Sequence, residues 1–150
     1  MKNQSEIVDF FREVQRVISK HGLSKVLVQL RNLQIDLEGF EKDVCEYIIS
    51  TTSNHYSILK EDLLHSNLRG KIAEARRMCF ALIKEHLPFS DEKIGNIFSR
   101  SKQYVHQELK SLPLNQNKLT TKHEAKFVND FMTITKEILT YKNAYNNNNI

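Results

Sequence analysis

The chain has 150 residues, of which 40% are hydrophobic and 27% charged, with a formal net charge of +4. Such a length and composition fit one globular domain, with or without an added helical segment, and exclude a chain too polar to bury a core. No apolar run approaches the length that a bilayer requires, and the first six residues lack the apolar core of a signal peptide. We therefore expect an intracellular, cytoplasmic protein without membrane contact.

Charge is distributed unevenly along the chain. Residues 1–68 hold eight Lys and Arg against ten Asp and Glu, whereas residues 69–112 hold nine against five. Residues 113–150 hold five against three. The positive excess of the middle segment favours a polyanionic partner, although many surface helices carry as much charge.

The first half of the chain shows helical periodicity. Apolar residues at three- and four-residue steps predict helices over 5–21, 24–33, 40–49 and 58–64. Gly22 is expected to end the first helix in a left-handed conformation. The polar stretches 34–39 and 50–55 interrupt the pattern and are predicted to be a loop and a break. Residues 66–70 are predicted to be a polar, partly basic segment that follows the fourth helix.

The second half is also helical, so the predicted fold is all-α, a multi-helix bundle. A strong pattern predicts a helix over 71–86, and Pro88 follows it, where proline cannot continue a helix. Residues 113–120 are rich in Asn and Gln and are predicted to be a linker. Thr121 and Glu124 have the spacing of a capping box that opens a final helix.

The segment 90–112 has the pattern of a helix-turn-helix, the motif that places a short helix in the major groove of DNA. Its apolar positions are Ile94, Phe98, Val105, Leu109 and Leu112. Gly95 lies where a side chain would hold the two helices apart. Ser90 and Ser101 are each expected to cap a helix through the hydroxyl group. The joint pattern is far more specific than any one of these features.

A set of polar and basic residues is predicted to contact DNA. Glutamine side chains suit adenine edges, and arginine and lysine suit guanine or phosphate. The alternative for each is an ordinary solvated helix surface, and Tyr104 could instead pack against the turn. Arg76 has the further alternative of an ion pair with Glu74 or Glu108. The predicted DNA-binding residues are Arg69, Lys71, Arg76, Arg77, Arg100, Ser101, Lys102, Gln103, Tyr104, His106, Gln107 and Lys110.

A second pattern extends over residues 62–112 and consists of Asp62-Leu63-Leu64, Arg69, Ile72 to Glu85, Leu87, Ser90, Glu92 to Gly95, Ile97-Phe98 and Val105. With these residues the segment resembles the C-terminal DNA-binding domain of DnaA-type replication initiators, which shares a superfamily with the Trp repressor. The resemblance implies a helical DNA-binding domain with a long helix before the turn. It also implies that Arg69, aligned with the arginine of the family's basic loop, enters the minor groove.

The chain departs from that family at two points. The family follows its phenylalanine with Gly-Gly-Arg/Lys-Asp-His-Thr-Thr-Val, whereas this chain has Ser99 to Val105, one residue shorter and without Asp-His-Thr-Thr. The family's base-reading residues therefore do not carry over. No phosphate-binding Gly-x-x-x-x-Gly-Lys-Ser/Thr loop occurs, so the ATPase of full initiators is missing.

Four parts are expected. Residues 1–41 form an N-terminal helical segment that either enlarges the core or makes a homodimer, and residues 42–112 form the helix-turn-helix domain. Residues 113–145 form a C-terminal helix and residues 146–150 a disordered tail. In a two-fold dimer, two recognition helices would lie about 34 Å apart on one face of DNA.

The functional prediction is sequence-specific binding of double-stranded DNA, with transcriptional regulation as the role. The alternative is an adaptor that reuses the fold to bind proteins, in connection with replication initiation. Six histidines and the cysteines Cys45 and Cys79 lack the spacing of a metal site or a catalytic nucleophile. The thiols are expected to be reduced and partly buried. We therefore expect no enzyme, no metal and no cofactor, and the sequence identifies no pocket for a small-molecule effector.

Overall fold

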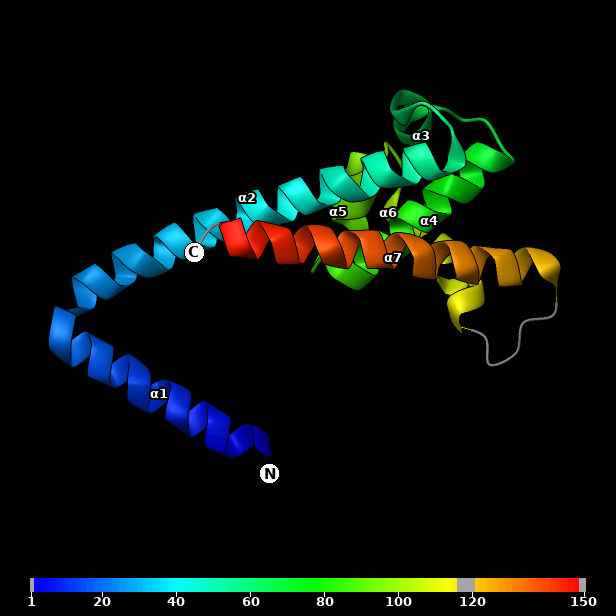
Figure 1. Cartoon of the computed structure of the whole chain (residues 1–150). Helices are drawn as coiled ribbons and strands as arrows, with labels where there is room; N and C mark the ends of the chain where they lie inside the picture. The colour runs from blue at the N-terminus through cyan, green and yellow to red at the C-terminus, as the bar shows by residue number, and fades with distance from the viewer. Residues whose placement is uncertain (1, 116–120, 149–150) are drawn as a thin grey trace. The chain divides into compact units, whose positions relative to one another are not determined.

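The computed structural model describes residues 2–115 and 121–148, and every regular element among them is helical (Figure 1). The elements are α1 (Lys2–His21), α2 (Leu23–Tyr56), α3 (Lys60–His65), α4 (Lys71–His86), α5 (Asp91–Ile97), α6 (Lys102–Lys110), the 3-10 helix η1 (Pro113–Asn115) and α7 (Lys122–Asn148). The predicted all-α fold with a helix-turn-helix is confirmed. The chain divides into two compact units, Met1–Phe40 and Glu41–Ile150.

The first unit holds α1 and the beginning of α2. Gly22 separates the two helices with φ of +80°, and its N–H donates to the carbonyl oxygen of Ile18 at 2.8 Å, as the sequence predicts for a helix end. Large apolar side chains of this unit remain more than two-fifths exposed: Ile7, Val8, Phe10, Phe11, Leu23, Leu27, Val28, Leu30 and Leu37.

The second unit is built around α4. Eight of its residues, from Ala75 and Arg76 through Met78 to Ile83, are buried, so the helix is enclosed on most sides. Both thiols lie in this unit: Cys45 of α2 is 5% exposed and Cys79 of α4 is fully buried, and both are free. Burial raises the pKa of Cys45 to about 11 and that of Cys79 to about 12, so both stay protonated at neutral pH.

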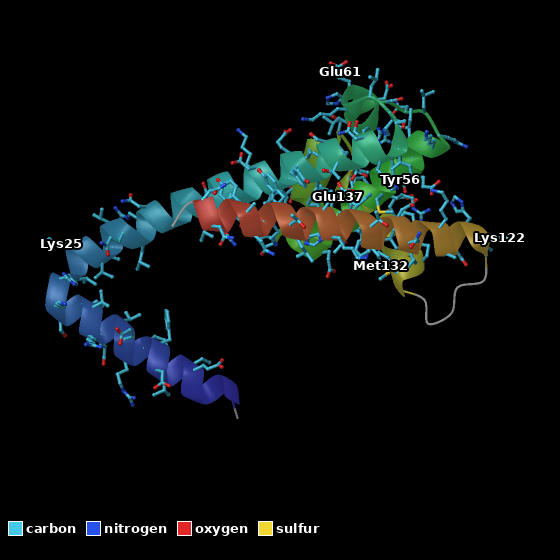
Figure 2. The ribbon with its side chains drawn as sticks, in the orientation of Figure 1. Lys25, Tyr56, Glu61, Lys122, Met132 and Glu137 are labelled. Atoms are coloured by element: carbon cyan, nitrogen blue, oxygen red, sulfur yellow. The ribbon has the colours of Figure 1, made fainter. Side chains whose placement is uncertain are left out.

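Helix α7 runs antiparallel to the second half of α2 (Figure 1). The rings of Tyr47 and Tyr141 stack at 4.0 Å, and the Tyr145 hydroxyl donates to Asp43 at 3.2 Å. At the other end of the pair, Tyr56, which is labelled in Figure 2, closes α2. Its hydroxyl donates to Asp130 of α7 at 3.4 Å. Helix α7 also buries Phe127, Ile134 and Ile138, so it belongs to the core of the second unit.

Four predicted segments differ in the structure. Helix α2 continues through 34–39 and 50–55, so the loop and the break predicted there are wrong. Gly39 costs a helix only about 1 kcal/mol, and the break disappears because Thr52 and Ser53 are buried by packing. Helix α7 reaches Asn148, so the predicted disordered tail is wrong for 146–148, and residues 149–150 lie outside the described part. The linker predicted over 113–120 begins as η1, and residues 116–120 are likewise not described.

Candidate nucleic-acid interface

Helix α5 begins as the sequence predicts. The hydroxyl oxygen of Ser90 accepts a hydrogen bond from the N–H of Lys93 at 3.1 Å, which caps the helix. Asp91 and Glu92 occupy the first turn, where carboxylates meet the positive end of the helix dipole. Ile94 and Phe98 are fully buried, and the ring of Phe98 packs edge-on against Phe80 of α4 at 5.1 Å. These contacts hold α5 on the core.

The turn between α5 and α6 is compact because Gly95 has no side chain. The N–H of Arg100 donates to the Gly95 carbonyl at 2.8 Å, and Ser99 adopts φ of 54°, in the left-handed region. A Cβ atom at Gly95 would lie 2.5 Å from the carbonyl oxygen of Arg100. The predicted close approach at Gly95 is confirmed, and its partner is the backbone of the turn.

Helix α6 presents a polar flank to solvent. Its cap is Ser101, whose hydroxyl oxygen accepts from the N–H of Tyr104 at 3.2 Å, as predicted, and Val105 anchors the helix in the core. No hydrogen bond or ion pair within the described residues engages the exposed side chains on the remaining face, which are Lys102, Gln103, Gln107 and Lys110. These four side chains are available to an external partner.

Two of the predicted contact residues have intramolecular partners on this surface. His106 of α6 lies 3.1 Å from Asp91, which also accepts from Lys84 of α4 at 2.8 Å. The Lys84 hydrogen bond lowers the pKa of Asp91; partial burial opposes the shift and His106 reinforces it. Arg77 lies 3.0 Å from Glu108 and donates to the carbonyl oxygen of Ser111 at 3.2 Å. Arg77 and His106 therefore have part of their hydrogen-bonding capacity occupied.

Arg76 does not lie on the surface, and its predicted role as a phosphate contact is corrected. The residue is only 2% exposed, and its guanidinium donates to the backbone carbonyls of Leu63 at 2.9 Å and Ser66 at 2.6 Å. The predicted alternative, an ion pair with Glu74 or Glu108, is also absent among the described contacts. Burial, together with the nearby charge of Arg100, lowers the pKa of Arg76. The helical spacing could have indicated that Arg76 is buried, because position 76 is four residues after Ile72 and three before Cys79.

Tyr104 and Arg100 are half-buried around the turn. The ring of Tyr104 packs against Phe80 at 6.3 Å, and the guanidinium of Arg100 lies 5.8 Å from the Tyr104 ring centroid. Of the two alternatives for Tyr104, the structure takes the one in which it packs against the turn. Arg100 donates to the carbonyl oxygen of Ser66 at 2.6 Å and to Asn67 Oδ1 at 2.8 Å. Ser66 and Asn67, which were not predicted as site residues, thus accept from two arginines of this region.

The remaining cations carry uncompensated charge. Arg69 and Lys71 are exposed on either side of Gly70, at the start of α4. Within the described part of the chain, no carboxylate lies at ion-pair distance from Arg69, Lys71, Arg100, Lys102 or Lys110. Glu108 and Asp91 neutralise Arg77 and Lys84, but no carboxylate of the described residues neutralises these five cations. A net positive charge therefore remains on the loop 66–70, the turn and α6.

Among residues 2–115 and 121–148, no group of three or more His, Cys, Asp and Glu side chains comes together in a way that could hold a metal ion. Over the same residues, no helix combines the length and the apolar character needed to cross a membrane.

The comparisons with known proteins bear on the helix-turn-helix and its supporting helices. Residues 45–111, just under half of the chain, match the family described as Bacterial dnaA protein helix-turn-helix. No curated protein and no solved structure matches the chain. The matched segment covers residues 45–56 of α2, all of α3 to α6 and the turn that Gly95 closes. Residues 45–111 are thus similar to the helix-turn-helix of bacterial DnaA proteins, a family that indicates binding to DNA.

Proposed function

We propose that the chain binds double-stranded DNA sequence-specifically through α6 and acts as an intracellular transcriptional regulator, without catalysis or a cofactor. The observation that carries this proposal is the exposed flank of α6, on which four side chains have no partner among the described residues. Exposed polar side chains are normally hydrated, so this flank can exchange its water for an external polar ligand without breaking a contact within the described residues. Its place as the second helix of a helix-turn-helix makes that ligand the major groove.

The mechanism starts with long-range attraction by the unneutralised cations. Lys102 and Lys110 approach phosphates or guanine, and Gln103 and Gln107, four residues apart on one helix face, suit adenine edges. Resemblance to the initiator family assigns Arg69 to the adjacent minor groove, and Lys71 lies within two residues of it as a phosphate contact. Because cations release counterions when they neutralise phosphates, affinity should fall steeply with salt.

We further propose that the chain acts as a homodimer through its first unit. Among the described side chains of this unit, nine large apolar ones are 44–64% exposed, and exposed apolar surface of this kind suits an interface with a second chain. Two ion pairs within α1, Asp9 with Arg12 and Glu13 with Arg16, balance four of its charges, so the middle of its polar flank is nearly neutral. A second copy of the same surface fits this character better than a strongly charged partner does. A dimer would also supply the second half-site that a single module needs for specificity.

The experiment is selection of bound sequences from a random duplex pool, followed by binding isotherms across a salt series. The variant Lys102→Glu with Gln103→Ala should lose specific binding, with affinity for the selected duplex falling at least tenfold. The matched control Lys136→Glu with Asn129→Ala makes the same kinds of change on an exposed part of α7 and should bind as the wild type does. Equal affinity of the α6 variant and the control would remove α6 from the interface.

The adaptor hypothesis predicts a different outcome. An adaptor shows no salt-dependent shift of random duplex DNA, whereas the proposed regulator binds it weakly at low salt and releases it as salt rises. Sedimentation equilibrium on the same preparations reports the dimer, and Phe10→Asp with Phe11→Asp should convert it to a monomer. A monomeric wild-type chain would overturn the dimer proposal without touching the DNA-binding one.

A further inference from the structure

The loop 66–70 is tied to the helix-turn-helix by one shared acceptor. The carbonyl oxygen of Ser66 accepts a hydrogen bond at 2.6 Å from Arg76, which is anchored in α4, and another at 2.6 Å from Arg100 of the turn. Two guanidinium groups from different elements therefore converge on a single peptide group. Since like charges repel, this arrangement forms only because the carbonyl and its neighbours satisfy both donors.

Arg100 makes a second bond that fixes its orientation. While one nitrogen donates to Ser66, the other donates to Asn67 Oδ1 at 2.8 Å, so the planar fork bridges two successive residues of the loop. A further contact joins the same segments, because His65 Nδ1 lies 3.3 Å from the hydroxyl oxygen of Ser99. The turn that precedes α6 is thus linked to three consecutive residues, His65 at the end of α3 and then Ser66 and Asn67 of the loop.

The contacts of Arg100 also limit what it can do at a DNA surface. Both terminal nitrogens already donate within the chain, and the guanidinium lies beside the ring of Tyr104. Lys102, two residues further on, is exposed and has no partner within the described residues. The two cations at the start of α6 therefore differ in role: one is held by the protein and the other is available to a ligand.

We propose that Arg100 is a positioning residue that holds the loop 66–70 at a fixed distance from α6. Arg69 and the polar flank of α6 then contact the duplex at a fixed spacing along it. This inference rests on the proposed DNA-binding function. It departs from the sequence prediction that Arg100 itself contacts DNA. Its consequence is that discrimination between sequences depends on Arg100, whereas the non-specific attraction of the basic surface does not.

The first test needs no DNA. In the full chain, the heteronuclear NOE of the Leu68 and Arg69 amides should fall when Arg100→Lys or Asn67→Ala removes one end of the bridge. Lysine keeps the charge but offers a single point donor, which cannot span both acceptors. The control Asn96→Ala deletes the same amide from an exposed position of α5 and should leave both NOE values unchanged. Unchanged NOE values in both bridge variants would overturn the positioning role.

The second test measures the ratio of affinity for the selected duplex to affinity for a scrambled one. Arg100→Lys and Asn67→Ala should each lower this ratio roughly three- to tenfold, the order expected from losing one hydrogen bond of typical net strength. The slope of log affinity against log salt should stay constant. A direct phosphate contact predicts instead that Arg100→Ala lowers the slope by about one while Arg100→Lys is nearly harmless. That second pattern, or a constant ratio despite a mobile loop, would overturn the proposal.

A double-mutant comparison tests whether Arg69 depends on Arg100 for its contact with DNA. Arg69→Ala should cost less affinity for the selected duplex in the Arg100→Lys background than in the wild type, since the loop no longer presents Arg69 in a fixed place. If the wild-type chain binds no duplex DNA, the proposed function fails and the specificity role fails with it. The NOE experiment still decides whether Arg100 holds the loop, so the two failures are distinguishable.

Discussion

Replacing Gly95 with alanine tests whether the close approach of α5 to the turn sets the geometry of the whole motif. The added Cβ would lie 2.5 Å from the Arg100 carbonyl oxygen and 3.4 Å from the carbonyl carbons of Arg100 and Ser101. Comfortable non-bonded separations are about 3.5 Å or more, so the turn must move by on the order of 1 Å. The obstructing atoms belong to the backbone and cannot rotate away, unlike the end of a flexible side chain.

The magnitude follows from two opposing effects. Overpacking of this kind costs about 1–3 kcal/mol, while alanine gains up to about 1 kcal/mol over glycine within a helix. We therefore expect Gly95→Ala to lower the free energy of unfolding by about 1–2 kcal/mol, a substantial part of the ~5–15 kcal/mol typical of a domain. DNA affinity should fall as well, because α6 follows directly from the displaced turn.

Urea denaturation followed by circular dichroism measures the effect. The matched control is Gly39→Ala, since Gly39 also lies within a helix but an added Cβ there meets nothing within 4 Å. That control should be neutral or stabilising by up to about 1 kcal/mol. If Gly95→Ala proves as stable as Gly39→Ala, the turn does not press on α5 as the geometry requires and the reasoning is refuted.

Three further outcomes follow from the same structure. Arg76→Ala should lower the free energy of unfolding, measured in urea, by about 3 kcal/mol, because it empties a buried site and leaves carbonyls without donors. Arg77→Ala, which removes a partly exposed side chain, should cost about 1 kcal/mol or less. Similar losses in the two variants would contradict the structural role of Arg76. Ser99→Val should lower the free energy of unfolding by about 1–2 kcal/mol, because a β-branched residue resists the left-handed region, whereas Ser99→Gly should be tolerated. Equal urea midpoints of the two variants would refute strain at this position. The lowered pKa of Asp91 means that its stabilising effect is present above the carboxyl pKa of the unfolded chain, about 3.9, and is lost as pH falls through the folded value. Asp91→Asn should therefore make the loss of stability between pH 6 and pH 3 shallower, and an unchanged profile would show that Lys84 does not hold the carboxylate.

Local chemistry allowed much of the motif to be predicted. Ser90, Ser101 and Thr121 each cap a helix through short-range bonds that depend on residues within three positions, and all three predictions are confirmed. Gly95 could be located because few roles require a glycine inside a short helix. The bounds of α4 follow from a clear apolar period ended by a proline. Features determined within one turn of helix are therefore recoverable from one sequence.

Features determined by distant contacts were not recoverable in the same way. Residues 50–55 are polar and predict a break, yet they continue α2 because the second unit buries Thr52 and Ser53. Arg76 and Arg77 carry the same side chain. Helical spacing alone could have placed Arg76 inward, but the carbonyls that it binds and the contact of Arg77 with Glu108 depend on packing. The bridge from Arg100 to Asn67 spans 33 residues and leaves no periodic signal. Sequence alone therefore overestimated how many cations face outward.

The two buried thiols allow the opening of the second unit to be followed chemically. Cys45 on α2 and Cys79 on α4 are nearly or fully inaccessible and stay protonated at neutral pH, so a thiol-alkylating reagent can react only after these helices separate. Met1–Phe40 contains no cysteine, so fraying there leaves the labelling rate unchanged. Pulse alkylation would thus time the opening of the helix-turn-helix unit alone, with and without a duplex, in the unmodified protein.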